Sequence, residues 1–265
     1  MTEPRPEFWT ETYAKAFQHP QVAASYQHRP SYPPETFEIL SGLIVDTPRR
    51  VLDLGCGTGG LSRYLVDIAV HVDAVDFSAA MMEEGKHLPN GDSPKLTWKL
   101  GRAEEVTSDT PYALITTGDS LHWMEWEILL PHLRTLLSPN GSLAICNINT
   151  VPQAWQADEV QLFHKFSTMP AFQDVDLIAE LERRDLFTVR GKQETKPVPL
   201  IQTIEDYIES FHARSSLAHG RMDPAQSAAF DDAMRELLAR NDANQVETQV
   251  FARITWGKPH ARGAQ

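Results

Sequence analysis

The stretch Val51-Leu52-Asp53-Leu54-Gly55-Cys56-Gly57-Thr58-Gly59-Gly60 decides the fold of this 265-residue chain. It is a short apolar run that stops abruptly at glycines, which is typical of a buried strand followed by a tight turn. The run that follows, 60–69, places Leu61, Leu65 and Ile68 on one stripe of a helix. Glycines lack a Cβ, so a ligand can approach the main chain and the N–H groups of the next helix. The stretch predicts a strand, a ligand-binding turn and a helix.

Short β-branched runs continue to alternate with amphipathic segments on both sides of this stretch. Further strands are expected at 71–78, 95–106, 112–123, 141–149, 186–200 and 246–256. A helix is expected from Pro34 to near the Asp-Thr-Pro at 46–48. Further helices are expected at 78–88, 127–137, 151–166 and 174–184, after Thr203 and from Asp223-Pro224. This alternation predicts an α/β fold: a Rossmann-like, mainly parallel seven-stranded sheet flanked by helices, with helical cap insertions.

The same pattern divides the chain into four segments. We expect an N-terminal helical lid at 1–48, a Rossmann-like core at 49–150, substrate-cap insertions at 151–245 with a strand near 188–200, and a final strand and tail at 246–265. Because the insertions follow the parallel strands, they are expected to cover the carboxyl edge of the sheet.

Composition narrows the classes of function. The chain has 24 basic and 36 acidic side chains and a formal charge of -12, which disfavours nucleic acid as a partner. It has no stretch of eighteen apolar residues and no basic start followed by an apolar run, so neither a membrane span nor a secretory signal is expected. Its two cysteines, Cys56 and Cys146, lie in strand-like runs. These features favour a cytoplasmic, reducing compartment. A monomer or homodimer is expected.

Two carboxylates suggest what the glycine turn binds. Asp76 ends the second strand, where an acid can accept both hydroxyls of an unmodified ribose. Gly55, Gly57 and Gly60 also satisfy the dinucleotide fingerprint G-x-G-x-x-G, so the glycines alone leave the cofactor open. Asp53 tips the balance, because a carboxylate aimed into the turn suits a cationic amino acid better than a pyrophosphate. The structural alternatives are bonding of turn amides by Asp53 and helix capping by Asp76.

These residues resemble the class I S-adenosylmethionine-dependent methyltransferases. VLDLGCGTGGLS looks like their first motif and VDAVDFSAAMM like the second, while YQHRPSYPPE, GRAEEV and SLHWMEW resemble the small-molecule branch that includes the trans-aconitate methyltransferase relatives. The similarity is strong over residues 20 to 150 and weak afterwards. It implies S-adenosylmethionine as cofactor and S-adenosylhomocysteine as product.

The resemblance also implies roles for individual residues. Arg29 pairs with the cofactor carboxylate, Asp53 lies near its amino group, and Asp76 holds the ribose. Arg102 stands where many relatives have an acid, so the backbone of Ala103 serves the adenine instead. The full implied cofactor set is Arg29, Asp53, Gly55, Gly57, Gly59, Asp76, Phe77, Arg102, Ala103, Glu104, Thr117 and Gly118.

The residues expected to contact the methyl acceptor are marked by less specific motifs. His122 follows the fourth strand, where the methyl group should emerge, and is the candidate general base; the alternative is a histidine packed beside Trp123. A carboxylate acceptor needs no base. Aromatic residues near the N-terminus can form a lid, and polar residues after the helix that follows Thr203 can receive a polar or anionic substrate. The candidate substrate residues are Trp9, Tyr13, Tyr26, Trp123, Tyr207, His212 and Arg214.

The expected function is methyl transfer from S-adenosylmethionine to a small organic acceptor, more often to oxygen than to nitrogen or carbon. The chain has neither H-E-x-x-H nor C-x-x-C, and no metal is expected. One alternative is an NAD(P)-dependent oxidoreductase, which the glycine pattern and Asp76 also permit. The other is a protein that binds S-adenosylmethionine without transferring its methyl group.

Overall fold

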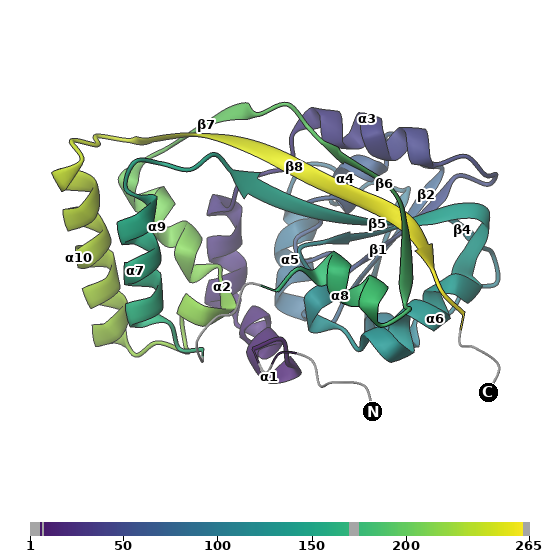
Figure 1. Ribbon diagram of the computed structural model, residues 1–265, viewed down its shortest axis with the longest axis horizontal. Coiled ribbons are helices and arrows are strands. Elements are labelled where there is room, and N and C mark those ends of the chain that lie inside the picture. The colour runs from purple at the N-terminus through teal and green to yellow at the C-terminus, as the bar shows by residue number, and fades with distance from the viewer. Residues whose placement is uncertain (1–5, 7, 170–174, 262–265) are drawn as a thin grey trace.

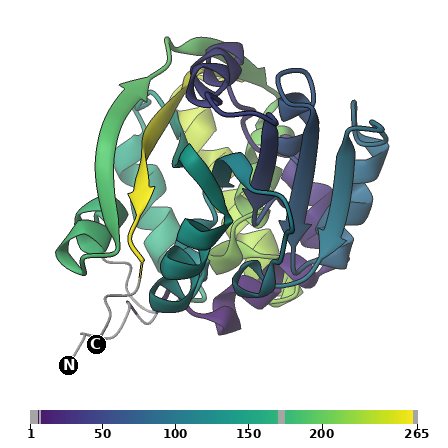
Figure 2. The same cartoon turned by 90° about the vertical axis from the view of Figure 1, so that its right-hand side faces the viewer.

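The sheet is the central element of the computed structural model, which describes residue 6, residues 8–169 and residues 175–261. Its strands are Arg50–Leu54 (β1), His71–Asp76 (β2), Leu96–Leu100 (β3), Tyr112–Gly118 (β4), Leu137–Thr150 (β5), Phe187–Glu194 (β6), Val198–Gln202 (β7) and Val246–Pro259 (β8). The order across the sheet is β3-β2-β1-β4-β5-β8-β6, and β7 pairs with β8. The first five strands are parallel, and β8 is antiparallel to each of its neighbours. Figure 2 shows the sheet from the β3 edge to the β6 edge.

The sheet has eight strands, not the expected seven, because its outer position is filled by two strands in line. β6 pairs with residues 253–259 of β8, and β7 pairs with residues 246–250 of the same strand. Between them the Thr195 hydroxyl accepts a hydrogen bond from the backbone N–H of Ala252, and Pro197 has no N–H to continue the ladder. The extended run 186–200 is therefore one strand position interrupted near its middle.

Helices cover both faces of the sheet (Figure 1). The apolar core on one face joins Val51 and Val72 to Leu40 of α3 and to Leu61 and Leu65. The core on the other face joins alternate residues of the same strands to α6 and α8. The α-helices are Glu11–Ala14 (α1), Pro20–Ser25 (α2), Pro34–Leu43 (α3), Ser62–Leu65 (α4), Ala79–His87 (α5), Trp126–Leu136 (α6), Gln156–Phe166 (α7), Leu177–Arg183 (α8), Ile204–His212 (α9) and Pro224–Arg240 (α10). The α4 helix is shorter than expected, a single turn.

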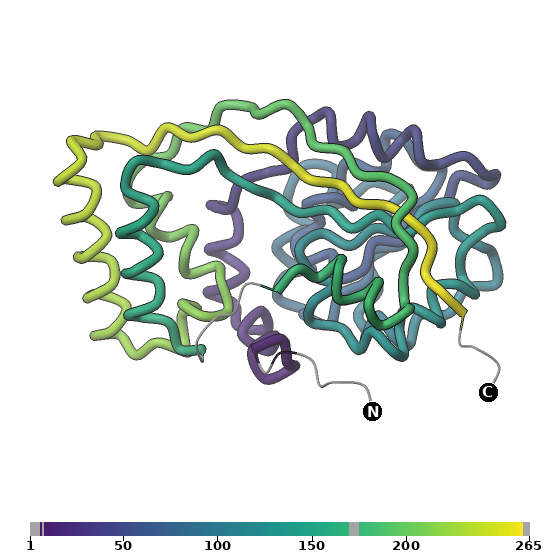
Figure 3. Tube along the Cα trace, viewed as in Figure 1, coloured from purple at the N-terminus to yellow at the C-terminus, as the bar shows by residue number. Residues whose placement is uncertain are grey.

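Three helices form a separate cap. Ile208 and Phe211 of α9 pack against Phe230, Met234 and Leu237 of α10, with partly buried residues of α7 beside them. The long strands β5 and β8 run from the sheet toward this cap, as the trace in Figure 3 makes clear. The short helix α2 lies between cap and core and contacts both α9 and α5. The cap is therefore joined to the sheet by strands and by the N-terminal segment.

One helix expected in the cap lies elsewhere. Leu181 of α8 is fully buried in the core beneath the sheet, where Leu177 and Ile178 also pack. The guanidinium of Arg184, just after α8, pairs with Glu127 of α6 and Glu180. The region 151–245 thus serves two surfaces: α7, α9 and α10 build the cap, and α8 covers the sheet.

None of the helices in the described part of the chain is both long and apolar enough to cross a lipid bilayer.

Candidate functional site

The glycine turn after β1 adopts a conformation that other residues rarely accept. Gly55, Gly57 and Gly59 have φ angles of +62°, +56° and +79°. A Cβ on Gly55 would lie 2.5 Å from the Cβ of Ser120, so this glycine also allows close approach of the segment after β4. A Cβ on Gly57 would meet little more than the end of the Met81 side chain, at 3.2 Å. Gly57 therefore leaves open space above the turn.

Asp76 ties the turn to the end of β2. Its carboxylate accepts hydrogen bonds from the backbone N–H of Gly57 and the backbone N–H of Ser78, both at 2.8 Å. Ser78, not Asp76, caps α5, because its hydroxyl accepts from the N–H of Met81. Burial raises the pKa of Asp76 despite these two amide bonds. Each carboxylate oxygen can accept more than one hydrogen bond, so Asp76 keeps capacity for a ligand.

Two adjoining cavities open at the carboxyl ends of β1, β2 and β4. The first has a volume of about 320 Å³ and the second about 250 Å³, and Tyr26, Gly55, Gly118 and Asp119 line both. Among the predicted site residues, the first cavity is also lined by Gly57, Asp76, Phe77, Arg102, Ala103, Glu104 and Trp123. The second is also lined by Arg29 and Asp53. The structure thus brings most of the predicted cofactor residues together around one continuous hollow.

Asp53 lies at the floor of the second cavity. Its carboxylate accepts hydrogen bonds from the hydroxyls of Ser62 and Thr116, the latter at 2.8 Å. Burial raises the pKa of Asp53 to about 6, and the two hydroxyls offset part of that effect. The carboxylate thus binds two hydroxyl groups and also the backbone of Ser62, at the start of α4. A buried, partly ionised carboxylate here suits a cationic group.

Two predicted cofactor residues lie behind the cavity walls. A Cβ on Gly59 would lie 2.7 Å from the Trp98 ring, so this glycine serves packing between the turn and β3. Thr117 is fully buried, and its hydroxyl has no hydrogen-bond partner among the described residues. Neither lines the two cavities. The structure therefore does not place Gly59 and Thr117 where they would contact a cofactor bound in these cavities.

The 3₁₀ turn Ala103–Glu105 contributes to one wall of the first cavity. Arg102 turns outward to pair with Glu11 at 3.1 Å and approaches Glu104 at 3.5 Å. Glu104 in turn accepts a hydrogen bond from the backbone N–H of Glu125 at 2.8 Å. The ion pair joins the N-terminal segment to the cavity rim, which leaves Ala103 as the backbone element facing the hollow.

His122 lies beside the wall of the first cavity rather than in it. Its half-buried ring packs against Trp9 and Trp123, with centroid distances of 5.5 and 4.6 Å. Trp123 lines the cavity, and His122 does not. Burial and the charge of Arg29 lower the pKa of His122 to about 4, so the imidazole is a weak proton acceptor at neutral pH. This geometry favours packing over the general-base role that sequence position suggested.

Some of the N-terminal aromatic residues line the first cavity, and others pack elsewhere. Phe17 and Tyr26 line the first cavity, and Phe17 contacts both Tyr26 and Trp123 edge-on. Trp9 packs instead against Trp126 in the core. Tyr13 lies outside both cavities, where the guanidinium of Arg221 covers its ring at 4.7 Å. Of the predicted lid, only part faces the hollow.

Sequence reasoning missed Asp119 as a site residue, although it lines both cavities. Asp119 has a φ of +48°, uncommon for any residue with a side chain. Its carboxylate accepts from the Asn147 amide at 2.9 Å and the Ile148 N–H at 3.1 Å. Burial raises the pKa of Asp119, and the Asn147 bond and the charge of Arg29 oppose that effect. A positive φ after a strand leaves no signal in the sequence.

Tyr32 was missed as well. It lines the second cavity, and its hydroxyl donates to the Cys146 carbonyl at 3.4 Å. A Cβ on Gly118 would lie 2.6 Å from that hydroxyl, so the two residues require each other. The sequence does hold a signal for this residue, because Tyr32 stands three positions after Arg29 in the same RPSYP motif.

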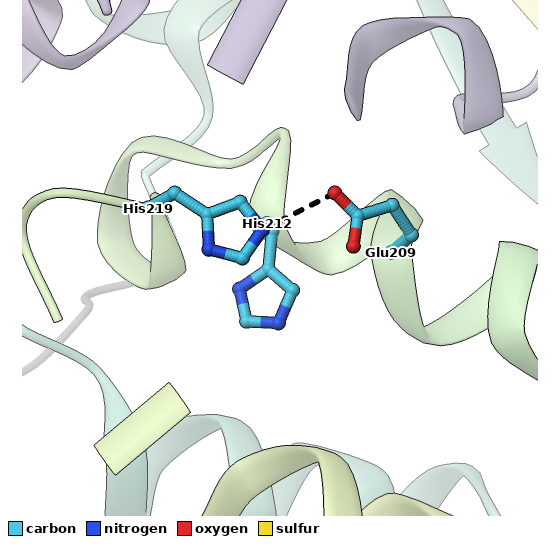
Figure 4. Close-up of side chains that lie close together, drawn as sticks. All are labelled: Glu209, His212 and His219. Atoms are coloured by element: carbon cyan, nitrogen blue, oxygen red, sulfur yellow. Dashed lines mark hydrogen bonds and ion pairs between the residues drawn. The ribbon is translucent and has the colours of Figure 1, made fainter. Parts of the chain in front are cut away.

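The cap residues predicted to meet substrate do not share one surface. His212 is fully buried: its Nδ1 contacts the Leu217 carbonyl and its Nε2 contacts Asp231, both at 2.8 Å. Its ring stacks on His219 at 4.1 Å, and His219 pairs with Glu209 at 3.2 Å (Figure 4). Both His212 nitrogens are therefore used within the protein, and the expectation that this side chain meets a substrate needs correction.

That cluster joins three parts of the cap to α2. Glu209 also accepts a hydrogen bond from the Ser25 hydroxyl of α2. Potential ligand atoms of Glu209, His212 and His219 lie within 4.8 Å of one another. The hydrogen bonds of His212 and Glu209 already account for this closeness, so the cluster acts as a link between cap and N-terminal segment.

Tyr207 and Arg214 lie on the other side of α9. The Tyr207 hydroxyl donates to Glu159 of α7, and burial together with that carboxylate raises the pKa of Tyr207. The Arg214 guanidinium lies over the Phe211 ring at 4.5 Å. Unlike His212, Arg214 is exposed.

Comparison with known proteins agrees with this geometry. Residues 51–141 match the family model described as a methyltransferase domain. An uncharacterised methyltransferase from Mycobacterium bovis is 34% identical over 125 residues, which are 47% of this chain and 49% of that protein. The trans-aconitate 2-methyltransferase of Pseudomonas paraeruginosa is 32% identical over 121 residues, 44% of this chain and 42% of that protein. The chain thus spans about half the length of the curated relatives it matches.

A solved structure described as a type II methyltransferase from Anaeromyxobacter dehalogenans superposes with a TM-score of 0.60 at 20% identity. The match covers 88% of this chain and 99% of that one, so the likeness of fold extends beyond residues 51–141. Residues 51–141 are thus similar to the methyltransferase domain, and the chain shares its fold with this solved structure.

Proposed function

We propose that the protein transfers the methyl group of S-adenosylmethionine to an oxygen atom of a small organic acceptor. The observation that carries this proposal is the pair of joined cavities at the carboxyl ends of β1, β2 and β4. Each has one Asp carboxylate that is almost fully buried, Asp76 in the first and Asp53 in the second, and both cavities share the partly buried Asp119. A nucleoside and a cationic amino acid are the two halves of this cofactor, and the two carboxylates match them in chemistry.

The first cavity fits the adenosine half. Asp76 has acceptor capacity left for the ribose hydroxyls, and Gly57 leaves the space above the turn open. A Cβ on Gly101 would meet no atom within 4 Å, so this wall is also open. Phe17 and Phe77 supply apolar surface for a base. These features support binding of the nucleoside with its ribose toward β2.

The second cavity fits the amino-acid half. The carboxylate of Asp53 suits an ammonium group, and the guanidinium of Arg29 suits a carboxylate. Among the described residues, the Arg29 side chain has no hydrogen bond or ion pair, and its guanidinium lies 5.7 Å from the centroid of the Tyr26 ring. The opposite charges that line this cavity support binding of a zwitterion.

When bound, the cofactor supplies a methyl group that is already activated by its sulfonium. The work left to the protein is to hold the acceptor in line and to exclude water. Phe17, Tyr26 and Trp123 line the hollow on its lid side and limit water there. His122 supports Trp123 from behind. An oxygen that is already ionised at neutral pH, such as a carboxylate oxygen, needs no base, which agrees with the low pKa of His122.

Two measurements test this function. Calorimetry should show binding of S-adenosylhomocysteine and none of NAD; the reverse result would favour an oxidoreductase. Incubation with S-adenosylmethionine and a panel of carboxylic acids and phenols should release S-adenosylhomocysteine, with methyl ester or methyl ether as co-product. Tight cofactor binding without turnover on any acceptor of either class would instead favour a binding protein.

A further inference from the structure

Of the described residues that line both cavities, one is charged. The residues shared by the two cavities are Tyr26, Gly55, Gly118 and Asp119. The two glycines have no side chain, so the groups available where the cavities meet are the ring of Tyr26 and the carboxylate of Asp119. By contrast, Asp76 lines the first cavity alone, and Asp53 lines the second alone. Asp119 therefore brings a carboxylate to the junction of the two cavities.

Strand β5 fixes the position of Asp119. The backbone N–H of Asp119 donates to the Cys146 carbonyl at 3.0 Å. Its carboxylate accepts from the side-chain amide of Asn147 at 2.9 Å and from the backbone N–H of Ile148 at 3.1 Å. A residue with a side chain rarely adopts a φ of +48°, and these three bonds hold Asp119 in that conformation. The carboxylate is thus held in place by the strand.

The hydrogen bonds of Asp119 favour its charged form and leave room for a ligand. Oδ1 accepts the bond from Asn147 and Oδ2 the bond from Ile148, so each oxygen keeps a lone pair. Both donors are neutral groups that favour an ionised carboxylate. Arg29 also lines the second cavity, but within the described ranges no cation forms an ion pair with Asp119. The junction therefore carries a negative charge that a bound cation can contact.

The proposed function brings a positive charge to the same junction. S-adenosylmethionine joins its nucleoside to its amino-acid tail through one sulfonium sulfur. With the nucleoside in the first cavity and the tail in the second, the sulfur lies where the cavities meet. A carboxylate attracts a sulfonium, and an aromatic ring such as that of Tyr26 attracts cations as well. The junction thus has the chemistry of a cation site.

We propose that the Asp119 carboxylate faces the sulfonium and makes the site prefer S-adenosylmethionine to S-adenosylhomocysteine, which is uncharged at sulfur. This inference rests on the proposed function. In the transfer, a lone pair of the acceptor oxygen forms the O–CH₃ bond, while the S–CH₃ bond breaks and leaves its electron pair on sulfur. The positive charge at sulfur disappears, and its attraction to Asp119 disappears with it. The spent cofactor is therefore held less tightly than the methyl donor.

Calorimetry with the two forms of the cofactor tests this inference, because they differ by one methyl group and its positive charge. Asp119→Asn removes the carboxylate charge, keeps the shape of the side chain and tolerates a positive φ. Affinity for S-adenosylmethionine should fall about 10- to 100-fold, the effect of losing one close opposite charge in a partly buried site. Affinity for S-adenosylhomocysteine should change by less than about threefold, since no charge at sulfur is lost.

Asp53→Asn is the matched comparison, because the amino group that Asp53 is proposed to face is present in both forms of the cofactor. This variant should weaken both forms by the same factor. Asp92→Asn, at an exposed position, should weaken neither. Equal losses for the two forms in Asp119→Asn would mean that Asp119 contacts the amino group or only fastens β4 to β5. That result, or unchanged affinity for both forms, would overturn the inference.

The wild-type titrations separate this inference from the proposed function. If the wild type binds neither form, the proposed function fails and the inference with it; if it binds both and the Asp119 variant does not discriminate between them, the inference alone fails. Thermal melting reports whether Asp119→Asn folds. If it does not, Asp119→Gly decides, because glycine accepts the positive φ and has no carboxylate. The same selective loss of affinity for S-adenosylmethionine is expected.

Discussion

The core around the glycine turn and the helical cap use charge in opposite ways. In the core, the buried carboxylates of Asp53 and Asp76 are held by short-range hydrogen bonds from hydroxyls and backbone amides. In the cap, His212 and Glu209 are locked in a network of side chains from three helices and a loop, while Arg214 has no ion pair with any described residue. One region presents buried carboxylates at the ends of parallel strands, and the other uses its buried polar side chains to hold helices together.

The difference follows from how each region is built. The core site lies where parallel strands end, so neighbouring strands bring their last residues together by topology alone. The cap is built from α7, α9 and α10, which meet through an apolar core of their own. Its polar residues are placed by long-range packing. A substrate site in the cap can therefore change without altering the cofactor site.

The largest effect is expected at the open wall of the cofactor cavity. Gly101→Leu fills space that the nucleoside needs, and a Cβ at this position would have no neighbouring atom within 4 Å, so the fold should tolerate it. We expect affinity for S-adenosylhomocysteine to fall about 10- to 100-fold, the effect of overpacking by a side chain. Calorimetry gives the affinity, and thermal melting should stay unchanged.

Gly42→Leu on α3 is the matched control, because a Cβ there also meets nothing within 4 Å and the site lies outside both cavities. Should both variants bind the cofactor as the wild type does, the nucleoside does not occupy the first cavity.

The pH dependence of cofactor affinity should report on the second cavity through Asp53. Because the pKa of Asp53 is about 6, its carboxyl is largely protonated at pH 5 and ionised at pH 7. An ammonium group favours the ionised form, so affinity for S-adenosylhomocysteine should rise up to about tenfold over this range. Asp53→Asn should flatten the profile, whereas Asp92→Asn on an exposed loop should keep it. A wild-type profile without slope would remove Asp53 from contact with the amino group.

His122 packs beside Trp9 and Trp123 at the core, and its variants separate a packing role from a catalytic one. His122→Phe keeps a ring between Trp9 and Trp123 but removes the proton acceptor, so turnover should stay within about threefold of the wild type. His122→Ala removes the ring that supports Trp123 and should lower turnover about 10- to 100-fold, because misplaced reactants react more slowly. Steady-state release of S-adenosylhomocysteine measures both. Equal, large losses in both variants would restore the general base.

The smallest effect concerns the stability of the cap. Burial disfavours the charge on His212, but hydrogen bonds to Asp231 and the Leu217 carbonyl outweigh it and raise the pKa of His212. A raised histidine pKa stabilises the fold fully below the unfolded value of about 6.5, and this contribution is lost as pH rises through the folded value. The free energy of unfolding should therefore decrease by roughly 1 kcal/mol above that pH.

Urea denaturation between pH 5.5 and 8.5 measures this change. His212→Asn should remove it, whereas His87→Asn, an exposed histidine at the end of α5, should not. A wild-type stability that rises with pH across this window would contradict the assignment of a protonated His212.

Much of the core could be read from the sequence because its signals are local. The run 51–60 specifies a strand and a turn, and Asp76 supplies a carboxylate at the end of the next strand. The structure has β1, the glycine turn and the carboxylate of Asp76 side by side, as expected. The failures occur where tertiary contacts decide. Nothing in the periodicity of 174–184 indicates that α8 packs beneath the sheet rather than in the cap. Likewise, the break at Thr195 depends on a hydrogen bond to Ala252 on a strand distant in sequence.

The same limit applies to single side chains. His212 and Arg214 lie two residues apart and look equivalent in the sequence, yet one is fully buried and the other exposed. The packing of α10 against α9 supplies Asp231 to His212, and no described residue forms an ion pair with Arg214.

A crystal structure of the protein with S-adenosylhomocysteine would locate both halves of the cofactor in a single experiment. Both ribose hydroxyls should lie within about 3 Å of the Asp76 carboxylate, with the base in the cavity lined by Phe77 and Ala103 and the amino-acid tail toward Asp53. A nucleoside bound elsewhere, or one whose ribose leaves Asp76 with only its bonds to Gly57 and Ser78, would refute the assignment of the two cavities.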